Sequence, residues 1–246
     1  KTNEEGEVFH DAFCFSCNKY HNPKSVEEAG VKMIEKENRQ QEQVDFSQIE
    51  SIPFRGWKAR NITRVTSAKY GVRTELEDED NVIARYYPIT NSGKVVGYKK
   101  RTLPKEFIGI GNTKSVNEMF GQSVFEAGQK YLVITTGEED AMAFAEVLRS
   151  KTGDTEYWTP CISVTAGDGS IIKQFKANFE YIQSFSKVVL AFDADESGQR
   201  YLEEAARLLS PGKAFIAKFP AGVKDASDLL KVGKGAELKQ VFWKAV

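Results

Sequence analysis

Short apolar runs alternate with amphipathic stretches through the second half of the sequence. The runs predict strands, and the stretches between them, where apolar residues recur at helical spacing, predict helices. Strands are expected over residues 131–135, 161–165, 187–192 and 214–219, and helices over residues 140–149, 171–185 and 198–209. This alternation is typical of right-handed crossover units on a buried parallel sheet. Ligands of such sheets bind at the carboxyl ends of the strands.

The middle of the sequence predicts an α+β region that precedes this sheet. A short helix over residues 62–70 is closed by Gly71, a usual residue at a helix end. Two strands are expected over residues 82–90 and 94–103, because Asn91-Ser92-Gly93 between them suits a tight hairpin turn. The acidic residues Glu75, Glu77, Asp78, Glu79 and Asp80 predict a solvated loop before the hairpin.

The N-terminal segment has a third pattern. Phe9, Phe13 and Phe15 alternate around Cys14 and Cys17, which predicts a strand or a hairpin. Residues 22–50 begin with Asn-Pro and are rich in Glu, Gln, Lys and Asn. Such a composition buries little apolar surface, so it predicts a linker.

Composition narrows the possible classes of protein. Lys plus Arg (34) nearly equals Asp plus Glu (35), so the net charge indicates no partner, and any affinity for nucleic acid must come from local segregation of charge. Apolar runs such as residues 188–192 are far shorter than the ~20 residues that span a bilayer, so we expect no membrane partner. Three cysteines, two of them in a CxxC, favour a reducing cytoplasm over a secreted disulfide scaffold.

Acidic residues follow three of the predicted strands. Asp193 and Asp195 come directly after residues 187–192, and period-two geometry directs both side chains to one side if the strand continues. Neighbouring carboxylates repel unless a cation lies between them, and hard oxygen ligands favour Mg²⁺ or Mn²⁺. The alternative is an acidic turn that caps the next helix. Glu138 and Asp140, after the first strand, and Asp225, after the last, should converge on the same edge of the sheet.

Basic residues are also segregated. Six of them and no acid occur between Arg55 and Thr74, with Arg60 among them. On the second hairpin strand, Lys99 and Arg101 share one face, and Lys105 joins them if the strand runs on. This face is suited to a triphosphate or a nucleic-acid backbone, and the alternative is an ordinary solvated basic face.

Cys14 and Cys17 form half of a zinc site. Tetrahedral zinc needs four ligands, and Cys161 in an apolar strand is better explained as core packing. Neither His10 nor His21 has a persuasive spacing, so we interpret the segment as part of a ribbon that lacks its first knuckle. Zinc binding is expected only if the other half is supplied.

These motifs together resemble a known family. A strand, a glycine with nearby acids, a helix, then FDADESG and KDASD resemble the Toprim domain, which DnaG-type primases, type IA and II topoisomerases and some nucleases share. The chain is more closely similar to the primase half of short-tailed-phage primase–helicases and to mitochondrial Twinkle. There, a ribbon ending in FC-x-x-C precedes a linker, a basic subdomain with a KxR-x3-K strand, and the Toprim subdomain.

The resemblance implies a domain order and a set of functional residues. It implies a partial zinc ribbon over residues 1–21, a linker over 22–50, a basic α+β subdomain over 51–125, and an α/β Toprim subdomain with C-terminal helices over 126–246. Asp193, Asp195 and Asp225 would bind catalytic Mg²⁺ or Mn²⁺, with Asp140 beside them. Lys99, Arg101 and Lys105, together with Arg60, would hold nucleotide and template.

One position departs from the family pattern. The family's Glu-Gly places its glutamate at Thr136, whose hydroxyl cannot act as a useful base near neutral pH. Glu138, two positions further on, is the candidate that could replace it. Twinkle-type proteins have lost such residues together with primase activity, and an engineered substitution is equally compatible with the sequence.

The resemblance implies a DNA primase that joins ribonucleotides on single-stranded DNA by a two-metal mechanism. Its partners would be the template, ribonucleoside triphosphates, the RNA primer, a hexameric helicase domain and a replicative polymerase, in the cytoplasm of the host if a phage encodes it. A non-catalytic Twinkle-like binding module and a Toprim nuclease are the alternatives, and a topoisomerase fits least. No GxxxxGK[ST] occurs, so we expect no helicase activity.

Overall fold

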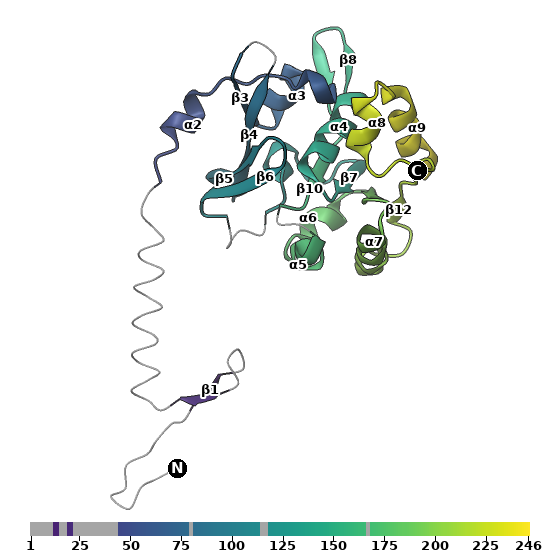
Figure 1. Cartoon of the computed structure of the whole chain (residues 1–246). Helices are drawn as coiled ribbons and strands as arrows, with labels where there is room; N and C mark the ends of the chain where they lie inside the picture. The colour runs from purple at the N-terminus through teal and green to yellow at the C-terminus, as the bar shows by residue number, and fades with distance from the viewer. Residues whose placement is uncertain (1–11, 15–18, 22–43, 79–80, 114–117, 166–167) are drawn as a thin grey trace, which may run out of the picture. The chain divides into compact units, whose positions relative to one another are not determined.

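The computed structural model describes residues 12–14, 19–21, 44–78, 81–113, 118–165 and 168–246 (Figure 1). The chain divides into two units, residues 1–45 and residues 46–246. In the first unit, strands β1 (Ala12–Cys14) and β2 (Lys19–His21) form an antiparallel pair, as the aromatic alternation predicted. Cys17, His10 and most of the predicted linker lie outside the described residues.

The second unit contains an antiparallel sheet and a parallel sheet. The antiparallel sheet has the order β3-β4-β5-β6. Its strands are β3 (Arg73–Leu76), β4 (Val82–Asn91), β5 (Lys94–Thr102) and β6 (Glu106–Gly111). The hairpin between β4 and β5 turns through Ser92 and Gly93, both with positive φ, as the Asn-Ser-Gly sequence predicted. Glu75 lies in β3 rather than in the expected acidic loop.

Short helices precede and flank this sheet. They are α2 (Ser47–Ser51), η1 (Lys58–Arg60) and α3 (Arg64–Lys69). Thr63 caps α3 by accepting a hydrogen bond from the Thr66 backbone N–H, and Gly71 follows the helix with φ +68°, as predicted. β5 ends at Thr102, so Lys105 lies in the turn before β6 and not on the strand itself.

The parallel sheet has the order β10-β7-β11-β12, and all of its neighbouring strands are parallel. Its strands are β10 (Cys161–Ser163), β7 (Tyr131–Thr135), β11 (Lys187–Ala191) and β12 (Ala214–Ile216). The apolar runs predicted all four, although three of them end one to three residues earlier than expected. Cys161 is fully buried in β10, which confirms its role in core packing.

Helices cover both faces of the parallel sheet, so the fold is α/β, as the alternating pattern predicted (Figure 1). One face carries α4 (Glu138–Leu148), α8 (Ala226–Lys231) and α9 (Gly235–Ala245). The other carries α5 (Ile171–Ala177), α6 (Phe179–Ser184) and α7 (Glu196–Leu208). The remaining elements are η2 (Gln122–Val124), η3 (Asp168–Ser170) and an exposed hairpin of β8 (Ser150–Thr152) and β9 (Thr155–Tyr157).

The single helix expected over residues 171–185 is two helices. Asn178 separates α5 from α6, because its backbone leaves the helical region (φ −111°, ψ 21°). Its backbone N–H and its side-chain amide both donate to the Gln174 carbonyl, at 3.0 and 2.8 Å, and so cap the end of α5. One hydrophobic core joins the two sheets, since Tyr70 stacks on Phe120 with ring centroids 5.2 Å apart and both pack into the cluster of β7 and β11. Within the described residues, no helix is long and apolar enough to cross a membrane.

The turn after β11 depends on a close backbone approach at Gly198. A Cβ atom at this position would lie 2.2 Å from the Asp193 carbonyl oxygen. The turn is also held by the Gly198 N–H, which donates to Asp195 Oδ1 at 2.9 Å, and by the Ala194 N–H, which donates to the Lys224 carbonyl at 2.8 Å. Glycine at position 198 is therefore what lets α7 begin directly beneath Asp193.

We expect Gly198→Ala to lower the free energy of unfolding by about 1–3 kcal/mol, because the added methyl group overlaps fixed backbone rather than a movable side chain. Gly169→Ala is the matched control, since nothing lies within 4 Å of its Cβ position and its φ is ordinary. The control should stay within about 0.5 kcal/mol of the parent in urea unfolding. Equal stability of the two variants would contradict the close approach.

Candidate functional site

A pocket of about 350 Å³ lies where the antiparallel sheet meets the carboxyl ends of the parallel strands. Its basic lining comes from η1, β5, the β5–β6 turn and the segment before α8, and its acidic lining comes from the turns after β7 and β11 and the start of α8. The charged lining residues are Arg60, Lys99, Arg101, Lys105, Lys224, Glu138, Glu139, Asp140, Asp193 and Asp225. The structure therefore brings the predicted acidic and basic groups together in one pocket, except Asp195, which does not line it.

A second pocket, of about 450 Å³, is lined by Arg55, Lys58 and Arg64 together with Ile62, Leu76 and Val82. Its described lining residues include no acidic side chain. Chemistry that needs both a cation-binding and an anion-binding group therefore belongs to the first pocket.

The acids after β7 are positioned by the start of α4. Gly137 is extended and precedes the first turn, which contains Glu138, Glu139 and Asp140. Negative charge is favourable at a helix N-terminus, so this turn tolerates three acids in a row. A Cβ at Gly137 would lie 2.6 Å from Asp140 Oδ2, so the glycine leaves room for that carboxyl group to face the pocket.

Asp140 is the most perturbed acid of the site. Burial raises its pKa well above the usual range, and the neighbouring Asp225 and Asp193 raise it further. The Ser227 backbone N–H donates to Asp140 Oδ1 at 2.8 Å and opposes this shift. Burial also raises the pKa of Asp225, which caps α8 by accepting from the Asp228 N–H at 2.8 Å. Burial and neighbouring carboxylates therefore both disfavour the charged forms of Asp140 and Asp225.

Asp193 and Asp195 share one cation from the protein. Lys224 Nζ lies 3.3 Å from Asp193 Oδ2 and 3.0 Å from Asp195 Oδ2. These contacts raise the pKa of Lys224, while the Gly198 N–H and Lys224 lower the pKa of Asp195. Asp195 also caps α7, which was the alternative interpretation of this motif. It is not among the lining residues of the pocket, whereas Asp193 is.

Thr136 contacts Asp193, one member of this pair. Its hydroxyl donates to Asp193 Oδ1 at 2.5 Å. Glu138, which the sequence suggested as a replacement for the missing glutamate, instead accepts a hydrogen bond from Lys99 Nζ at 2.8 Å. Both side chains line the pocket, but they bind different neighbours.

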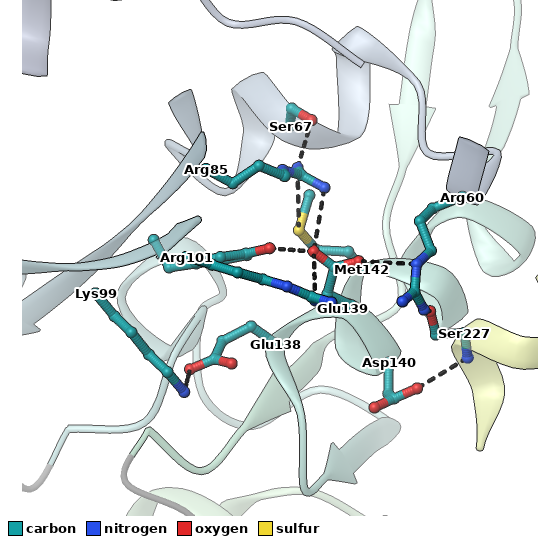
Figure 2. A network of polar contacts seen from close by, with 11 residues as sticks. Arg60, Ser67, Arg85, Lys99, Arg101, Glu138, Glu139, Asp140, Met142 and Ser227 are labelled. Atoms are coloured by element: carbon teal, nitrogen blue, oxygen red, sulfur yellow. Dashed lines mark hydrogen bonds and ion pairs between the residues drawn. The ribbon is translucent and has the colours of Figure 1, made fainter. Parts of the chain in front are cut away.

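A buried ion cluster beside the pocket centres on Glu139 (Figure 2). Its Oε1 atom lies 3.4 Å from Arg85 Nη1 and 3.5 Å from Arg101 Nη1, and it accepts a short hydrogen bond from the Tyr87 hydroxyl. Glu139 Oε2 lies 3.9 Å from Arg60 Nε. All three guanidinium groups also lie 5.2–5.3 Å from the ring centroid of Trp57. Glu139 is therefore the common anion of three cations.

This cluster changes the role expected for two of the basic residues. Arg101 is only 9% exposed and is paired with Glu139 as well as lining the pocket. Arg60 donates to Ser227 Oγ at 2.6 Å, which ties η1 to α8. Lys99 is not part of this cluster, and besides Glu138 it contacts the Thr165 carbonyl, to which it donates at 3.3 Å.

Sequence reasoning missed Arg85, Tyr87, Glu139, Phe107 and Lys224. Arg85 offered a signal, since a lone arginine amid the apolar residues of a predicted strand needs a buried partner. The sequence offered no signal for Lys224, because its neighbour Asp225 was the obvious candidate. The contacts of Lys224 with Asp193 and Asp195 form only in the folded chain. Of the half zinc site, Cys14 ends β1 and Cys17 lies outside the described residues. No group of three or more His, Cys, Asp or Glu in the described ranges is already arranged to hold a metal ion.

Comparison with known proteins gives one consistent family. Residues 133–230 match the "Toprim-like" family. The DNA helicase/primase of Enterobacteria phage T3 is 32% identical over 191 residues, which cover 76% of this chain and 31% of that protein. A primase homolog protein and a chloroplastic/mitochondrial Twinkle homolog protein, both from Arabidopsis thaliana, are 27% and 28% identical and each match 73% of this chain. The chain spans between about a quarter and a half of the length of these relatives.

Solved structures agree with these relatives. The primase fragment of the bacteriophage T7 primase–helicase matches with a TM-score of 0.67 and 26% identity over 95% of this chain and 90% of that one. A T7 structure in which the lagging-strand DNA polymerase interacts with primase domains of two gp4 subunits, bound to an RNA/DNA hybrid and dTTP, matches with a TM-score of 0.65. Its identity is 30% over 78% of this chain and 92% of that one.

We expect Glu139→Gln to lower the free energy of unfolding by about 3–5 kcal/mol, because it leaves buried guanidinium groups without their anion. The matched control is Glu203→Gln, which removes a glutamate from an exposed pair with Arg207 on α7. Glu203→Gln should lower the free energy of unfolding by less than about 1 kcal/mol. Denaturant unfolding measures both, and similar losses in the two variants would show that Glu139 is not the anchor of the cluster.

Proposed function

Because this chain belongs to the family formed by the primase half of the phage primase–helicases, we propose that it synthesises short RNA primers on single-stranded DNA. The observation that carries this proposal is the pocket itself, in which a basic sheet face opposes acidic strand ends. Nucleotidyl transfer needs both features, since phosphates must be held by cations while carboxylates hold divalent metal. A nucleic-acid groove that only binds would not need the acids.

The substrates proposed for this pocket are a ribonucleoside triphosphate and a template strand with its growing primer. The positive charge at the pocket comes from Lys99, Lys105, Arg60 and Arg101, all of which line it. The T7 structure with an RNA/DNA hybrid and dTTP supports this choice of ligand class. Such positioning of the reacting groups is a large part of what phosphoryl-transfer enzymes contribute.

The residues present fit a divalent cation. Asp193 and Asp195 already share the Lys224 ammonium group, so this pair can bind a cation. Burial raises the pKa of both Asp140 and Asp225, and neighbouring carboxylates raise it further, a repulsion that a cation would relieve. Asp193, Asp195 and Asp225 would hold the metal, with Asp140 beside them. When bound, Mg²⁺ or Mn²⁺ would stabilise negative charge on the transferring phosphate and lower the pKa of the attacking hydroxyl.

The chain's own residues would orient the reactants and hold positive charge in fixed positions at the pocket. Lys99, held by Glu138 Oε1 and the Thr165 carbonyl, is fixed at the pocket and available to a phosphate oxygen. The Glu139 cluster keeps Arg60 and Arg101 in one arrangement, so little reorganisation is needed when an anion enters. The Thr136 hydroxyl donates a hydrogen bond to Asp193 Oδ1, and because it is uncharged and weakly basic it would not act as a general base near neutral pH.

One observation favours a second candidate, a non-catalytic binding module of the Twinkle type. At the position of the family glutamate, Thr136 offers a hydrogen-bond donor in place of a carboxylate. A protein impaired only at this position would keep its nucleotide and strand affinity while its chemistry slowed.

Further parts of the proposal concern the rest of the chain and its setting. We propose a partial zinc ribbon over residues 1–21, a linker over 22–50 and the two subdomains meeting near residue 125. By analogy with the family, a hexameric helicase domain and a replicative polymerase would act with this primase. The proposed compartment is the cytoplasm of the host cell.

Lys224→Ala should strengthen Mn²⁺ binding about two- to tenfold, because it removes the ammonium group that competes for Asp193 and Asp195. The double variant Asp193→Asn, Asp195→Asn should lose Mn²⁺ binding. Lys234→Ala is the matched control, since Lys234 is comparably exposed and pairs with Glu237 of α9, away from the pocket. Isothermal titration calorimetry measures all three, and undiminished binding in the double variant would contradict the metal site.

Ribonucleotide incorporation on a mixed-sequence single strand with Mg²⁺ or Mn²⁺ tests the function. We expect synthesis that depends on metal and on Asp193, and we expect Thr136→Glu to raise it by roughly 10²–10⁴-fold, as a positioned acid–base group typically does. The added carboxylate should be tolerated because bound metal offsets its charge beside Asp193.

Other outcomes of this assay are also informative. Robust synthesis by the parent chain with no gain in Thr136→Glu would mean that Glu138 or a water molecule fulfils the role of the glutamate. No synthesis by either form, with Mn²⁺ still bound, would reject the primase and leave the binding module. Cleavage of the strand in place of extension would indicate a Toprim nuclease.

A further inference from the structure

Phe107 is an exposed aromatic residue in the lining of the catalytic pocket. It lies on β6, the edge strand of the antiparallel sheet, directly opposite Arg101 on β5. The residue is 48% exposed, although large apolar side chains normally gain stability from burial. Tyr87, the other aromatic lining residue, is 1% exposed and bonded to Glu139. Within the described lining, Phe107 is thus the aromatic ring that an incoming molecule can reach.

Cations hold this ring at the pocket. Lys99 Nζ lies 4.8 Å from the ring centroid of Phe107, and Arg101 Cζ lies 5.8 Å from it. These are the residues to which the proposed function assigns phosphate groups. A nucleotide whose phosphate reaches Lys99 would therefore bring its sugar and base close to Phe107.

We propose that Phe107 is a stacking platform for a nucleobase at the catalytic pocket. This inference rests on the proposed function and deepens it by naming the group that contacts a base. Aromatic side chains bind bases of any sequence, because every base has a π face. The base belongs either to the template strand or to the incoming nucleotide, and both present the same chemistry to the ring.

A purely structural role for Phe107 makes a different prediction. The ring could serve only to cover the aliphatic stems of Lys99 and Arg101, and a leucine would do this nearly as well. Stacking requires the aromatic face, so Phe107→Leu separates the two roles and Phe107→Tyr should restore function. Ile108→Ala is the matched control, because Ile108 is 51% exposed on the same strand but alternates to the opposite face of the sheet.

The experiment compares ligands with and without bases. Fluorescence anisotropy measures binding of a mixed-sequence single strand against a strand of abasic residues with the same backbone. Calorimetry measures binding of ATP against inorganic triphosphate. We expect the parent chain to bind the base-containing ligand of at least one pair more tightly than its base-free partner. Phe107→Ala and Phe107→Leu should lower the affinity for that base-containing ligand by roughly 5- to 150-fold. Abasic or base-free binding should change little in these variants.

The salt dependence provides an independent readout. Phe107→Leu should leave the slope of log affinity against log salt unchanged, because it removes no phosphate contact, whereas Lys105→Ala should reduce it. If Phe107→Leu loses the preference for the single strand over the abasic strand, the stacked base belongs to the template. If it loses the preference for ATP over inorganic triphosphate, the stacked base belongs to the incoming nucleotide. Either result supports the proposal.

Three results would overturn the proposal. The first is a preference for base-containing ligands that survives in Phe107→Leu, and the second is a loss of affinity for these ligands in Ile108→Ala as large as in the Phe107 variants. The third is a parent chain with no preference for base-containing ligands. Failure of the proposed function is detected separately, by the absence of primer synthesis in the parent chain. A chain that binds bases through Phe107 but makes no primer would retain this inference and lose the primase.

Discussion

The arrangement of the pocket depends on the buried carboxylate of Glu139. Three arginines from η1, β4 and β5 approach one another beneath Trp57, and without an anion their mutual repulsion would separate the segments that carry them. Glu139 stands in the first turn of α4, in the parallel-sheet half of the fold. Its ion pairs therefore hold the basic sheet against the acidic strand ends at a fixed distance and orientation.

Around Glu139, acidic and basic side chains of the pocket lie close to one another in ion pairs. Lys99 binds Glu138 and Lys224 binds Asp193 and Asp195, so several groups that the proposed chemistry needs are already paired. Lys224, Asp193 and Asp195 are more exposed than Glu139, so solvent screens their ion pairs and makes the exchange of partners inexpensive. Glu138 is as buried as Glu139, and only its partner Lys99 is more exposed. Under the proposed function, a phosphate would compete with Glu138 for Lys99, whereas Glu139 would keep Arg85 and Arg101 in position.

The sequence indicated most of the elements and the acidic half of the site. Apolar runs located all four parallel strands, and the rule that ligands gather at their carboxyl ends brought Asp140, Asp193 and Asp225 together. Period-two spacing correctly placed Lys99 and Arg101 on one face of β5. Such patterns depend on neighbours along the chain, which is why they can be recognised without a structure.

The remaining features depend on contacts between distant segments. Arg85 and Glu139 are 54 residues apart, and neither has a local partner that reveals the pairing. The strand β6 was not predicted because Glu106-Phe107-Ile108-Gly109-Ile110-Gly111 has two glycines and no clear alternation, and its pairing with β5 is what makes it a strand. Phe107 was missed with it, since its importance follows only from the residue that lies opposite.

Lys224 has a consequence for how the protein handles metal. Folding brings Asp193 and Asp195 into contact with a cation that the chain itself carries, so this pair does not require an external ion in order to assemble. Zinc fingers behave differently, because their ligands have no such substitute and the fold is lost when the ion is removed. If the proposed metal site is used, a chelator would therefore stop the reaction while the fold stays intact, and adding the ion back would restore activity without refolding.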